Sequence, residues 1–465
     1  MRLLINTVIC FLWCTMSLAS DTYRAGVVNS VHSDLTEYVP FIQQAAESDV
    51  DILVLPSAEE LFFETSTFGS DIYDDVVKTL SDATKQAGLY VVAHLYETVR
   101  CQDSNETVRS NLVFGRDGSV ISVYRKPVNN VSNCTTGSTD FGVFTTDFDV
   151  TFGSLMEEDL VLKSPGELKG LKNFVVTGSW TTQIPFLSAS KFSSSWAFVN
   201  KVNLVSIDGI SDGSATNGDV KFADLEKHGL QDVKFRAPVI HTAELQGFLG
   251  EDASQYVIKP LNLEASSRGY KDAVCHGSFC CEFYVKTSFA GYKAVNANYS
   301  LVAFSGYRHF GSGHNIGLES CAVIASAGQD KCTCPVGNEN SASYLRFDKV
   351  TVVGNFTNGN SNYPIVLTTR APQAKHLSFD SISIDNTEQV VMELKNVANV
   401  LSLGISSRDF SKDIINSLSI EPKYKDELDI YDYIFNEDVQ EFFDYVWIRL
   451  RILIFVVSIY ILEMM

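Results

Sequence analysis

The chain changes its hydrophobic pattern once, and that change most constrains its fold. In the first half, short apolar runs typical of strands alternate with segments of helical spacing. Strands are predicted at residues 26–28, 51–56 and 89–96, and helices at residues 35–48 and 74–88. This alternation predicts an α/β domain in which helices cover sheets.

The same domain continues with a hairpin and a second set of strands. Residues 116–119 read Arg-Asp-Gly-Ser between two apolar runs, and Asp-Gly supplies the positive φ that a tight hairpin turn needs. Further strands are predicted at residues 148–152, 174–180 and 202–207, with a helix at 187–200. We expect this α/β domain to span residues 21–235.

After residue 270 the pattern consists of strand-like runs without intervening helices. Regularly spaced strands of this kind predict a β-rich, sandwich-like second domain. We expect that domain at residues 271–440, with a linker or boundary at 236–270. The six clearest runs are at 281–287, 299–306, 344–354, 363–369, 376–384 and 390–396.

Both ends of the chain carry apolar segments. Residues 3–18 follow Met1-Arg2 and end in small residues, which indicates a secretory signal peptide at residues 1–20. Within the tail at 441–465, residues 446–462 are apolar apart from two arginines, and we interpret the tail as a GPI signal that tethers the protein to the membrane. A membrane helix and a packed amphipathic helix stay open. The expected location is extracellular, either secreted or GPI-anchored at the cell surface.

The cysteine count supports an oxidising compartment. Eight cysteines remain after the signal peptide, and an even number in an exported chain predicts disulfides. Their pairing stays open, because eight cysteines allow about 105 connectivities. Zinc binding by the Cys-x-Cys pair near residue 333 is disfavoured, since its spacing is too short. The candidates are Cys101, Cys134, Cys275, Cys280, Cys281, Cys321, Cys332 and Cys334.

Five Asn-x-Ser/Thr sequons agree with an exported glycoprotein. They are at Asn105, Asn130, Asn133, Asn298 and Asn355.

Charge and motif content exclude some functions. The net charge is −20 and no basic run occurs, which argues against nucleic-acid binding. No cofactor motif is present, so we expect no cofactor and no metal.

Residues 152–160, FGSLMEEDL, form the most informative stretch. An apolar strand followed by a turn and an acidic pair is typical of an elbow that presents a side chain at a sheet edge. The stretch resembles the nucleophile elbow of the vanin and biotinidase branch of the nitrilase superfamily, where FGxxxC is followed by an aromatic residue and Asp. Residues 178–206, 274–285 and 316–325 also resemble vanin segments. The resemblance implies a four-layer αββα domain, a β-rich vanin C-terminal domain, and hydrolysis of an amide such as pantetheine or a biotinamide.

The chemistry that the resemblance implies needs a thiol nucleophile, a carboxylate base and a lysine that stabilises the oxyanion. Lys126, in the sequence YRK, matches the lysine. Ser57 stands at the position of the glutamate, and Glu157 at that of the cysteine. The glutamates at 59 and 60 are displaced, and a shift of about 1 Å already costs about a hundredfold in rate.

We therefore expect a vanin-like protein that lacks the amidase triad and acts as a binding or interaction module. Its ligand would be a small amide of the pantetheine or biotin type. Two alternatives stay open: an active amidohydrolase that uses displaced residues, and a purely structural extracellular glycoprotein.

Two finer expectations concern the acidic pair. Adjacent residues in an extended segment point to opposite faces, so Glu157 and Glu158 are not expected to converge. If Glu157 and Lys126 occupy their matched positions, they are expected to form a buried ion pair. His309, His314, Trp180 and Trp196 are expected to be surface or packing residues.

Overall fold

The computed structural model describes most of the chain between residues 20 and 415. The described residues are 20–28, 30, 32, 35–56, 62–64, 75–101, 104–127, 142–168, 170–178, 189–207, 209–211, 215–217, 219–230, 255–289, 298–310, 314–326, 345–368, 376–398 and 400–415.

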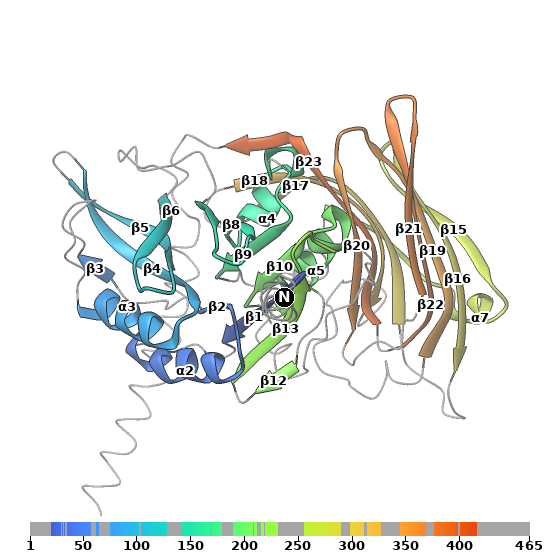
Figure 1. Cartoon of the computed structure of the whole chain (residues 1–465). Helices are drawn as coiled ribbons and strands as arrows, with labels where there is room; N and C mark the ends of the chain where they lie inside the picture. The colour runs from blue at the N-terminus through green and yellow to red at the C-terminus, as the bar shows by residue number, and fades with distance from the viewer. Residues whose placement is uncertain are drawn as a thin grey trace, which may run out of the picture. The chain divides into compact units, whose positions relative to one another are not determined.

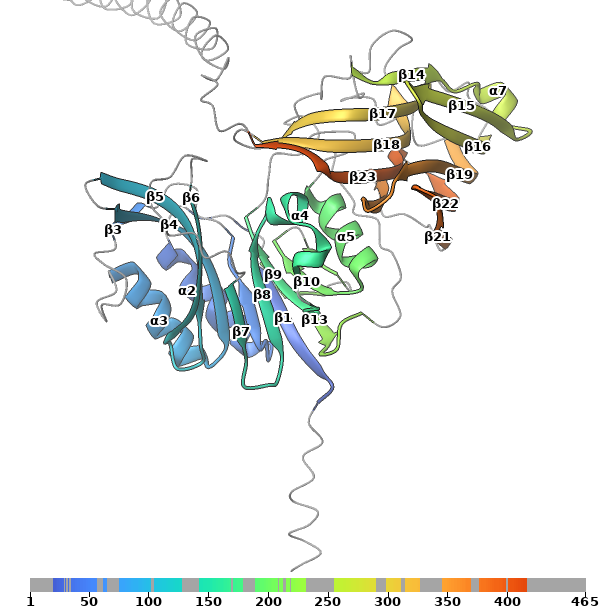
Figure 2. The ribbon, with the colours of Figure 1, turned by 90° about the horizontal axis from the view of Figure 1, so that it is seen from above.

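Two sheets form the centre of the first domain (Figures 1 and 2). One follows the order β12-β13-β1-β2-β4-β5-β6, with β3 paired to β4, and the other follows β11-β10-β9-β8-β7. The strands of the first sheet are β1 Thr22–Val28, β2 Ile52–Val54, β3 Phe62–Glu64, β4 Tyr90–Cys101, β5 Ser104–Phe114, β6 Val120–Pro127, β12 Ala215–Asn217 and β13 Val220–Glu226. Those of the second are β7 Gly142–Thr145, β8 Thr151–Met156, β9 Asn173–Thr177, β10 Asn203–Ser206 and β11 Gly209–Ile210.

Helices cover the outer faces of these sheets. Helices α2 and α3 pack on the first sheet through Ile42 and Leu80, and α5 packs on the second through Trp196. The facing sides of the two sheets share a separate apolar core that includes Val54 and Phe152. This arrangement is the four-layer αββα architecture expected from the sequence. The helical elements are η1 Leu35–Tyr38, α2 Val39–Glu47, α3 Asp75–Ala87, α4 Asp159–Leu162, η2 Pro165–Leu168 and α5 Ala189–Asn200.

Two five-stranded antiparallel sheets form the second domain, as the β-rich pattern predicted. Their orders are β14-β17-β18-β23-β20 and β15-β16-β19-β22-β21, and a large apolar core lies between them. Helix α7 Leu263–Ser266 precedes β15. The strands are β14 Val257–Pro260, β15 Tyr270–His276, β16 Phe279–Phe289, β17 Asn298–Phe310, β18 His314–Ser326, β19 Leu345–Thr357, β20 Ser361–Thr368, β21 His376–Ile384, β22 Thr387–Ala398 and β23 Val400–Ile415. Because β14 pairs with β17, pairing within this domain begins inside the segment 236–270.

Two disulfides are present among the described residues. Cys275 and Cys280 lie opposite each other in the β15–β16 hairpin, and both are exposed. Cys281 and Cys321 are buried and join β16 of one sheet to β18 of the other. Neighbouring residues in a strand point to opposite faces, so Cys280 points outward while Cys281 enters the core. Cys101 lies at the end of β4, and Cys134, Cys332 and Cys334 lie outside the described residues.

Two predictions of local structure were wrong. The strand expected at 148–152 is β8, which begins at Thr151, because Asp149 adopts a positive φ of 60° in the turn after β7. Strand β23 was not predicted, since its centre is polar. That centre is nevertheless buried, and Arg408 there donates to the carbonyl oxygen of Gly317 at 2.5 Å and to Asp413 at 2.7 Å.

Two sequence features lie outside the described residues. Neither the expected signal peptide nor the tail at 441–465 belongs to the described residues. Within the described part of the chain, no helix has the length and apolar character needed to cross a membrane.

We predict that the two disulfides differ in their contribution to stability. In the chain-entropy model, the bridge across 40 residues contributes about 4 kcal/mol and the bridge across 5 residues about 2 kcal/mol. Cys281→Ala/Cys321→Ala should therefore lower the free energy of unfolding more than Cys275→Ala/Cys280→Ala, measured by urea denaturation without reductant. Equal losses would contradict this ranking.

Candidate functional site

The end of β8 forms the centre of the candidate site. The strand ends at Met156, Glu157 and Glu158 form a turn, and α4 begins at Asp159. Gly153 within β8 allows close packing, because a Cβ there would lie 2.8 Å from the Phe174 ring. The strand-to-turn elbow predicted from the sequence is present, and its turn begins at Glu157, four residues after Gly153.

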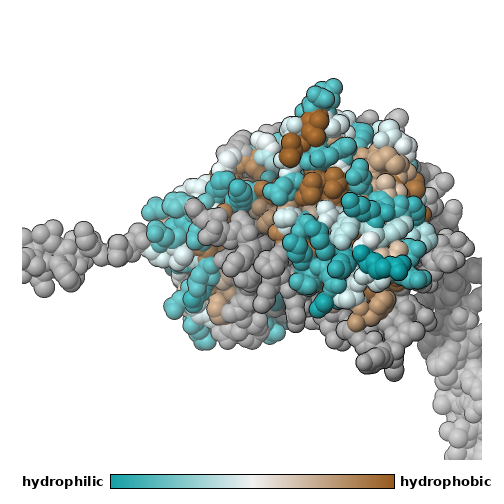
Figure 3. Space-filling view, turned by 90° about the vertical axis from the view of Figure 1, so that its right-hand side faces the viewer, coloured by the Kyte–Doolittle hydropathy of each residue, from teal (hydrophilic) through white to brown (hydrophobic). Residues whose placement is uncertain are grey.

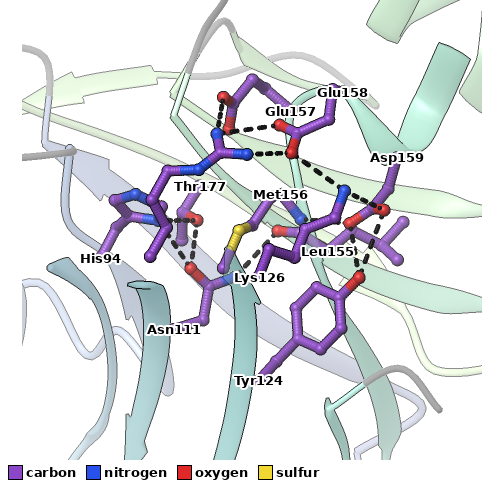
Figure 4. Close-up of polar contacts among 11 residues, drawn as sticks. His94, Asn111, Tyr124, Lys126, Leu155, Met156, Glu157, Glu158, Asp159 and Thr177 are labelled. Atoms are coloured by element: carbon purple, nitrogen blue, oxygen red, sulfur yellow. Dashed lines mark hydrogen bonds and ion pairs between the residues drawn. The ribbon is translucent and has the colours of Figure 1, made fainter. Parts of the chain in front are cut away.

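Two cations from the other sheet face this turn. Arg109 of β5 lies directly opposite Lys126 of β6 in the antiparallel register. Directly opposite residues share a face of the sheet, so both side chains reach the same carboxylates. Figure 4 shows Lys126 in contact with Glu158 and Asp159.

The contacts form a continuous ion-pair network. The Lys126 Nζ atom lies 2.7 Å from Asp159 Oδ1 and 2.9 Å from Glu158 Oε1. The Arg109 Nη1 atom donates to Glu157 Oε1 at 2.9 Å and to Glu158 Oε2 at 3.1 Å, and Nη2 also donates to Glu158. The Asp159 side chain is fully buried and those of the other four residues are 14–20% exposed.

The expected ion pair between Lys126 and Glu157 is wrong. Arg109 takes Glu157 as a partner, while Lys126 pairs with the two acidic residues that follow. The sequence analysis missed Arg109. Its signal was weak, because the first eight residues of β5, SNETVRSN, are polar apart from one valine, so Arg109 does not stand out from its neighbours.

The expectation that Glu157 and Glu158 diverge is also wrong. Both carboxylates accept from the same Arg109 Nη1 atom, because the two residues lie in a turn and not in an extended strand. The alternation rule applies only to extended backbone.

Asp159 fixes the shape of the turn. Its Oδ2 atom accepts from the backbone nitrogen of Met156 at 2.8 Å, and both carboxylate oxygens accept from the Tyr124 hydroxyl at 3.1–3.2 Å. Burial, followed by the charge of Asp159, raises the pKa of Tyr124, so its hydroxyl stays protonated and donates. Asp159 therefore serves a structural purpose at this position.

The two glutamates differ in electrostatic environment. Burial and the charge of Glu158 raise the pKa of Glu157, against the opposing effect of Arg109. Burial also acts to raise the pKa of Glu158, but Lys126 and Arg109 outweigh it and hold that pKa below the ordinary value. A protonated Glu157 leaves two carboxylates facing two cations.

The Glu157 side chain occupies space that is open only because its neighbour, Gly178, has no side chain. A Cβ at Gly178 would lie 2.3 Å from Glu157 Oε2, and Gly178 has a positive φ of 76°. The Oε2 atom is buried and has no hydrogen-bond partner among the described residues. A protonated carboxyl loses less from this burial than a carboxylate would.

A buried neutral network supports the strands beneath the site. Asn111 Nδ2 donates to Ser154 and to the Leu155 carbonyl oxygen, while its Oδ1 atom accepts from the Thr177 hydroxyl at 2.5 Å. His94 Nδ1 lies 2.8 Å from the same Asn111 oxygen. Burial lowers the pKa of His94 to about 4, so this ring is neutral at physiological pH.

A second buried carboxylate was also missed by the sequence analysis. Glu97 of β4 is 2% exposed, and both of its oxygens accept from Arg125, at 2.5 and 3.1 Å. The guanidinium occupies both oxygens, so Glu97 is already paired.

The remaining predicted residues are accounted for as follows. Trp196 is buried in the core and His309 is exposed, as expected, and His314 is half-buried. No cluster of three metal-ligating side chains occurs in the described ranges. Asn355 is exposed on β19, and Asn105 and Asn298 lie in β5 and β17. Ser57, Asn130, Asn133 and Trp180 lie outside the described residues.

We predict strong coupling between Lys126 and Glu158. Lys126→Met and Glu158→Gln should each destabilise the protein by roughly 3–5 kcal/mol, because each strands a buried charge. The double variant should cost less than the sum by about 1–3 kcal/mol in urea unfolding. The matched control is the cycle of Lys126→Met with Glu157→Gln, which should be closer to additive. Equal coupling in both cycles would contradict the observed pairing.

We also predict opposite pH dependences for the two glutamates. The native state retains the Glu157 proton above the ordinary carboxyl pKa near 4.3, while the unfolded state releases it, so this group lowers stability as the pH rises. Glu157→Gln should therefore gain stability relative to wild type between pH 5 and neutrality. Above the ordinary carboxyl pKa, ionised Glu158 stabilises the folded state, and this stabilisation is lost as the pH falls. The free energy of unfolding of Glu158→Gln should therefore be closest to that of wild type at low pH. Parallel pH profiles from urea denaturation would be the contrary result.

Comparison with known proteins agrees with both halves of the fold. The family model of the vanin C-terminal domain matches residues 247–413. Vanin-like protein 1 of Drosophila melanogaster is 27% identical over 413 residues, covering 72% of this chain and 74% of that protein. Vanin-like protein 2 of the same organism is 25% identical over 392 residues, covering 68% of this chain and 74% of that protein.

Among solved structures, Saccharomyces cerevisiae Nit3, a member of branch 10 of the nitrilase superfamily, aligns with 44% of this chain and 91% of its own. The TM-score of 0.35 and the 17% identity are too low to carry an argument by themselves. The sequence matches to vanin-like proteins extend over most of the chain. Residues 247–413 therefore belong to the vanin C-terminal domain family, and most of the chain is similar to vanin-like proteins.

Proposed function

We propose that this chain is an extracellular vanin-like glycoprotein that does not hydrolyse amides and acts as a binding or interaction module. The observation that carries the proposal is the ion-pair network at the end of β8. By resemblance, Lys126 and Glu157 stand at catalytic positions of the family. Both side chains form ion pairs with other residues of the chain.

The first argument concerns the nucleophile. Amide hydrolysis through an acyl intermediate needs an activated nucleophile, which is a thiol in this family. Glu157 stands at the thiol's position, and one of its oxygens accepts from Arg109 while the other is buried against Gly178. A carboxyl held in this way, and kept protonated by burial, is a poor nucleophile.

The second argument concerns the oxyanion. A lysine stabilises a developing negative charge when its own charge is not already compensated. Here Asp159 and Glu158 lie 2.7 and 2.9 Å from the Lys126 ammonium. A substrate oxygen would have to compete with two carboxylates for that ammonium, so the stabilisation would be small.

A ligand class follows from the same charges. With Glu157 protonated, two carboxylates balance two cations at this turn, so the network attracts neither an anionic nor a cationic ligand by net charge. A small neutral amide of the pantetheine or biotin type is the ligand that we propose to test first.

Export of the chain rests on several sequence features. The apolar N-terminal segment, the sequons and the apolar tail favour a secreted or GPI-anchored protein. Two disulfides among the described residues are consistent with an oxidising compartment.

We predict that the purified protein does not turn over pantetheine or biotinamide. The control is the double variant Ser57→Glu/Glu157→Cys, which should gain more activity than either single change because triad members act as a unit. Turnover by wild type that disappears in Lys126→Ala would overturn the proposal. In parallel, either amide should raise the Tm if the protein is a binding module, and no shift would favour a purely structural glycoprotein.

A further inference from the structure

The β21–β22 hairpin carries the most exposed large apolar side chain among the described residues, and a second exposed isoleucine beside it. Ile382 is 62% exposed and Ile384 44% exposed, and all the residues at 380–387 are exposed. Figure 1 shows the hairpin projecting at the top of the second domain, and Figure 3 shows apolar atoms at that projecting tip. An isolated exposed isoleucine needs no explanation, but two in one edge strand do.

Among the described residues, nothing gives the edge strand β21 the usual protection. Exposed edges pair with other chains unless proline, lysine, a bulge or a covering group prevents it. The other edges of the second domain have such features: β14 has Lys259 and Pro260, and β20 has Pro364 and a bulge at Leu367/Thr368. Edge strand β15 has Lys271 and a disulfide. Strand β21 has nine residues in unbroken register, with Asp380 as its one acidic side chain and no proline or lysine.

The register shows what lies beside the exposed isoleucines. Ile382 of β21 is directly opposite Gln389 of β22, and Gln389 is directly opposite Asn355 of β19. Gln389 Nε2 donates to Asn355 Oδ1 at 3.2 Å, which places both side chains on one face. Directly opposite residues share a face, so Ile382 is on that face too. Two strand spacings, about 10 Å, separate it from Asn355.

Asn355 is an exposed sequon residue, in Asn355-Phe356-Thr357. Its hydrogen bond with Gln389 uses the oxygen, so the amide nitrogen is available for a glycan. An N-linked glycan is bulky and hydrophilic and extends from its attachment point over the neighbouring surface. Ile384 of β21 lies directly opposite Thr387 of β22. Thr387 in turn lies directly opposite Thr357 of β19, the last residue of the sequon.

We propose that Asn355 carries an N-linked glycan that covers the apolar face of the β21–β22 hairpin and prevents β21 from pairing with a second copy of the chain. The glycan acts as the missing edge protection. This role rests on the proposed export of the chain, because sequons are modified only in the secretory pathway.

The test uses the full chain secreted from eukaryotic cells. Glycopeptide mass spectrometry should find Asn355 occupied, and light scattering should find a uniform low-mass species. Asn355→Gln should shift the protein to a mass at least about twice as large, because an edge-to-edge contact joins whole copies. Asn298→Gln, which removes another sequon, should leave the mass unchanged apart from its glycan.

Two further measurements separate shielding from misfolding. Trimming the native wild-type glycans with an endoglycosidase should produce the same association without any substitution. Adding Ile382→Ser and Ile384→Ser to the Asn355→Gln variant should restore the low-mass species. Association that persists in that triple variant would overturn the proposed surface.

The remaining outcomes distinguish this inference from the proposed function. An unmodified Asn355 beside another occupied sequon overturns the shielding role alone. If Asn355 carries a glycan but trimming that glycan changes the mass only by the lost sugar, the shielding role is also overturned and the proposed function is not. A chain that is retained in the cell and carries no glycan overturns the extracellular location, and the shield with it.

Discussion

The burial of two cations at the end of β8 is the constraint on which the site depends. Arg109 and Lys126 come from adjacent strands and share one face, so their charges add in a small volume. Leaving either charge unpaired there would cost several kcal/mol, which is why three acidic residues converge on them. The turn that brings those acidic residues together is held by Asp159, which binds the Met156 nitrogen, Tyr124 and Lys126 at once. Backbone shape and charge balance therefore depend on the same carboxylate.

That interdependence has a consequence for chemistry. A catalytic lysine must keep its charge available for the transition state, whereas here the charge stabilises the folded turn. Glu157 is accommodated because Gly178 leaves room for its side chain. Beneath it, the Asn111 network joins strands of both sheets and keeps the strand ends in place. The scaffold of the site is thus rigid, while its reactive groups are engaged in ion pairs.

In the second domain the alternation of side chains along strands has a similar organising effect. It sends Cys281 into the core and Cys280 to the surface, so adjacent cysteines join different partners. It also places Asn355 and Ile382 on one outward face. These two residues are 27 positions apart in sequence and become neighbours through the β19–β22 and β22–β21 pairings. Local sequence patterns do not predict which strands pair.

The sequence by itself determined the two-part architecture, because strand and helix periodicities are local and Asp-Gly and Gly turns mark their ends. The resemblance of residues 152–160 to the vanin elbow predicted that Glu157 stands at the nucleophile's position and Asp159 at that of the family's aspartate. Only the tertiary structure decided the partners. Arg109 enters the site from a strand 48 residues earlier, and the turn at Glu157 and Glu158 directs both carboxylates to it. Strand β23 reads as a loop until the buried partners of Arg408 are known. The physical reason is the same in each case: ion pairing and the burial of polar groups depend on distances between segments, which strand pairing sets and residue order does not.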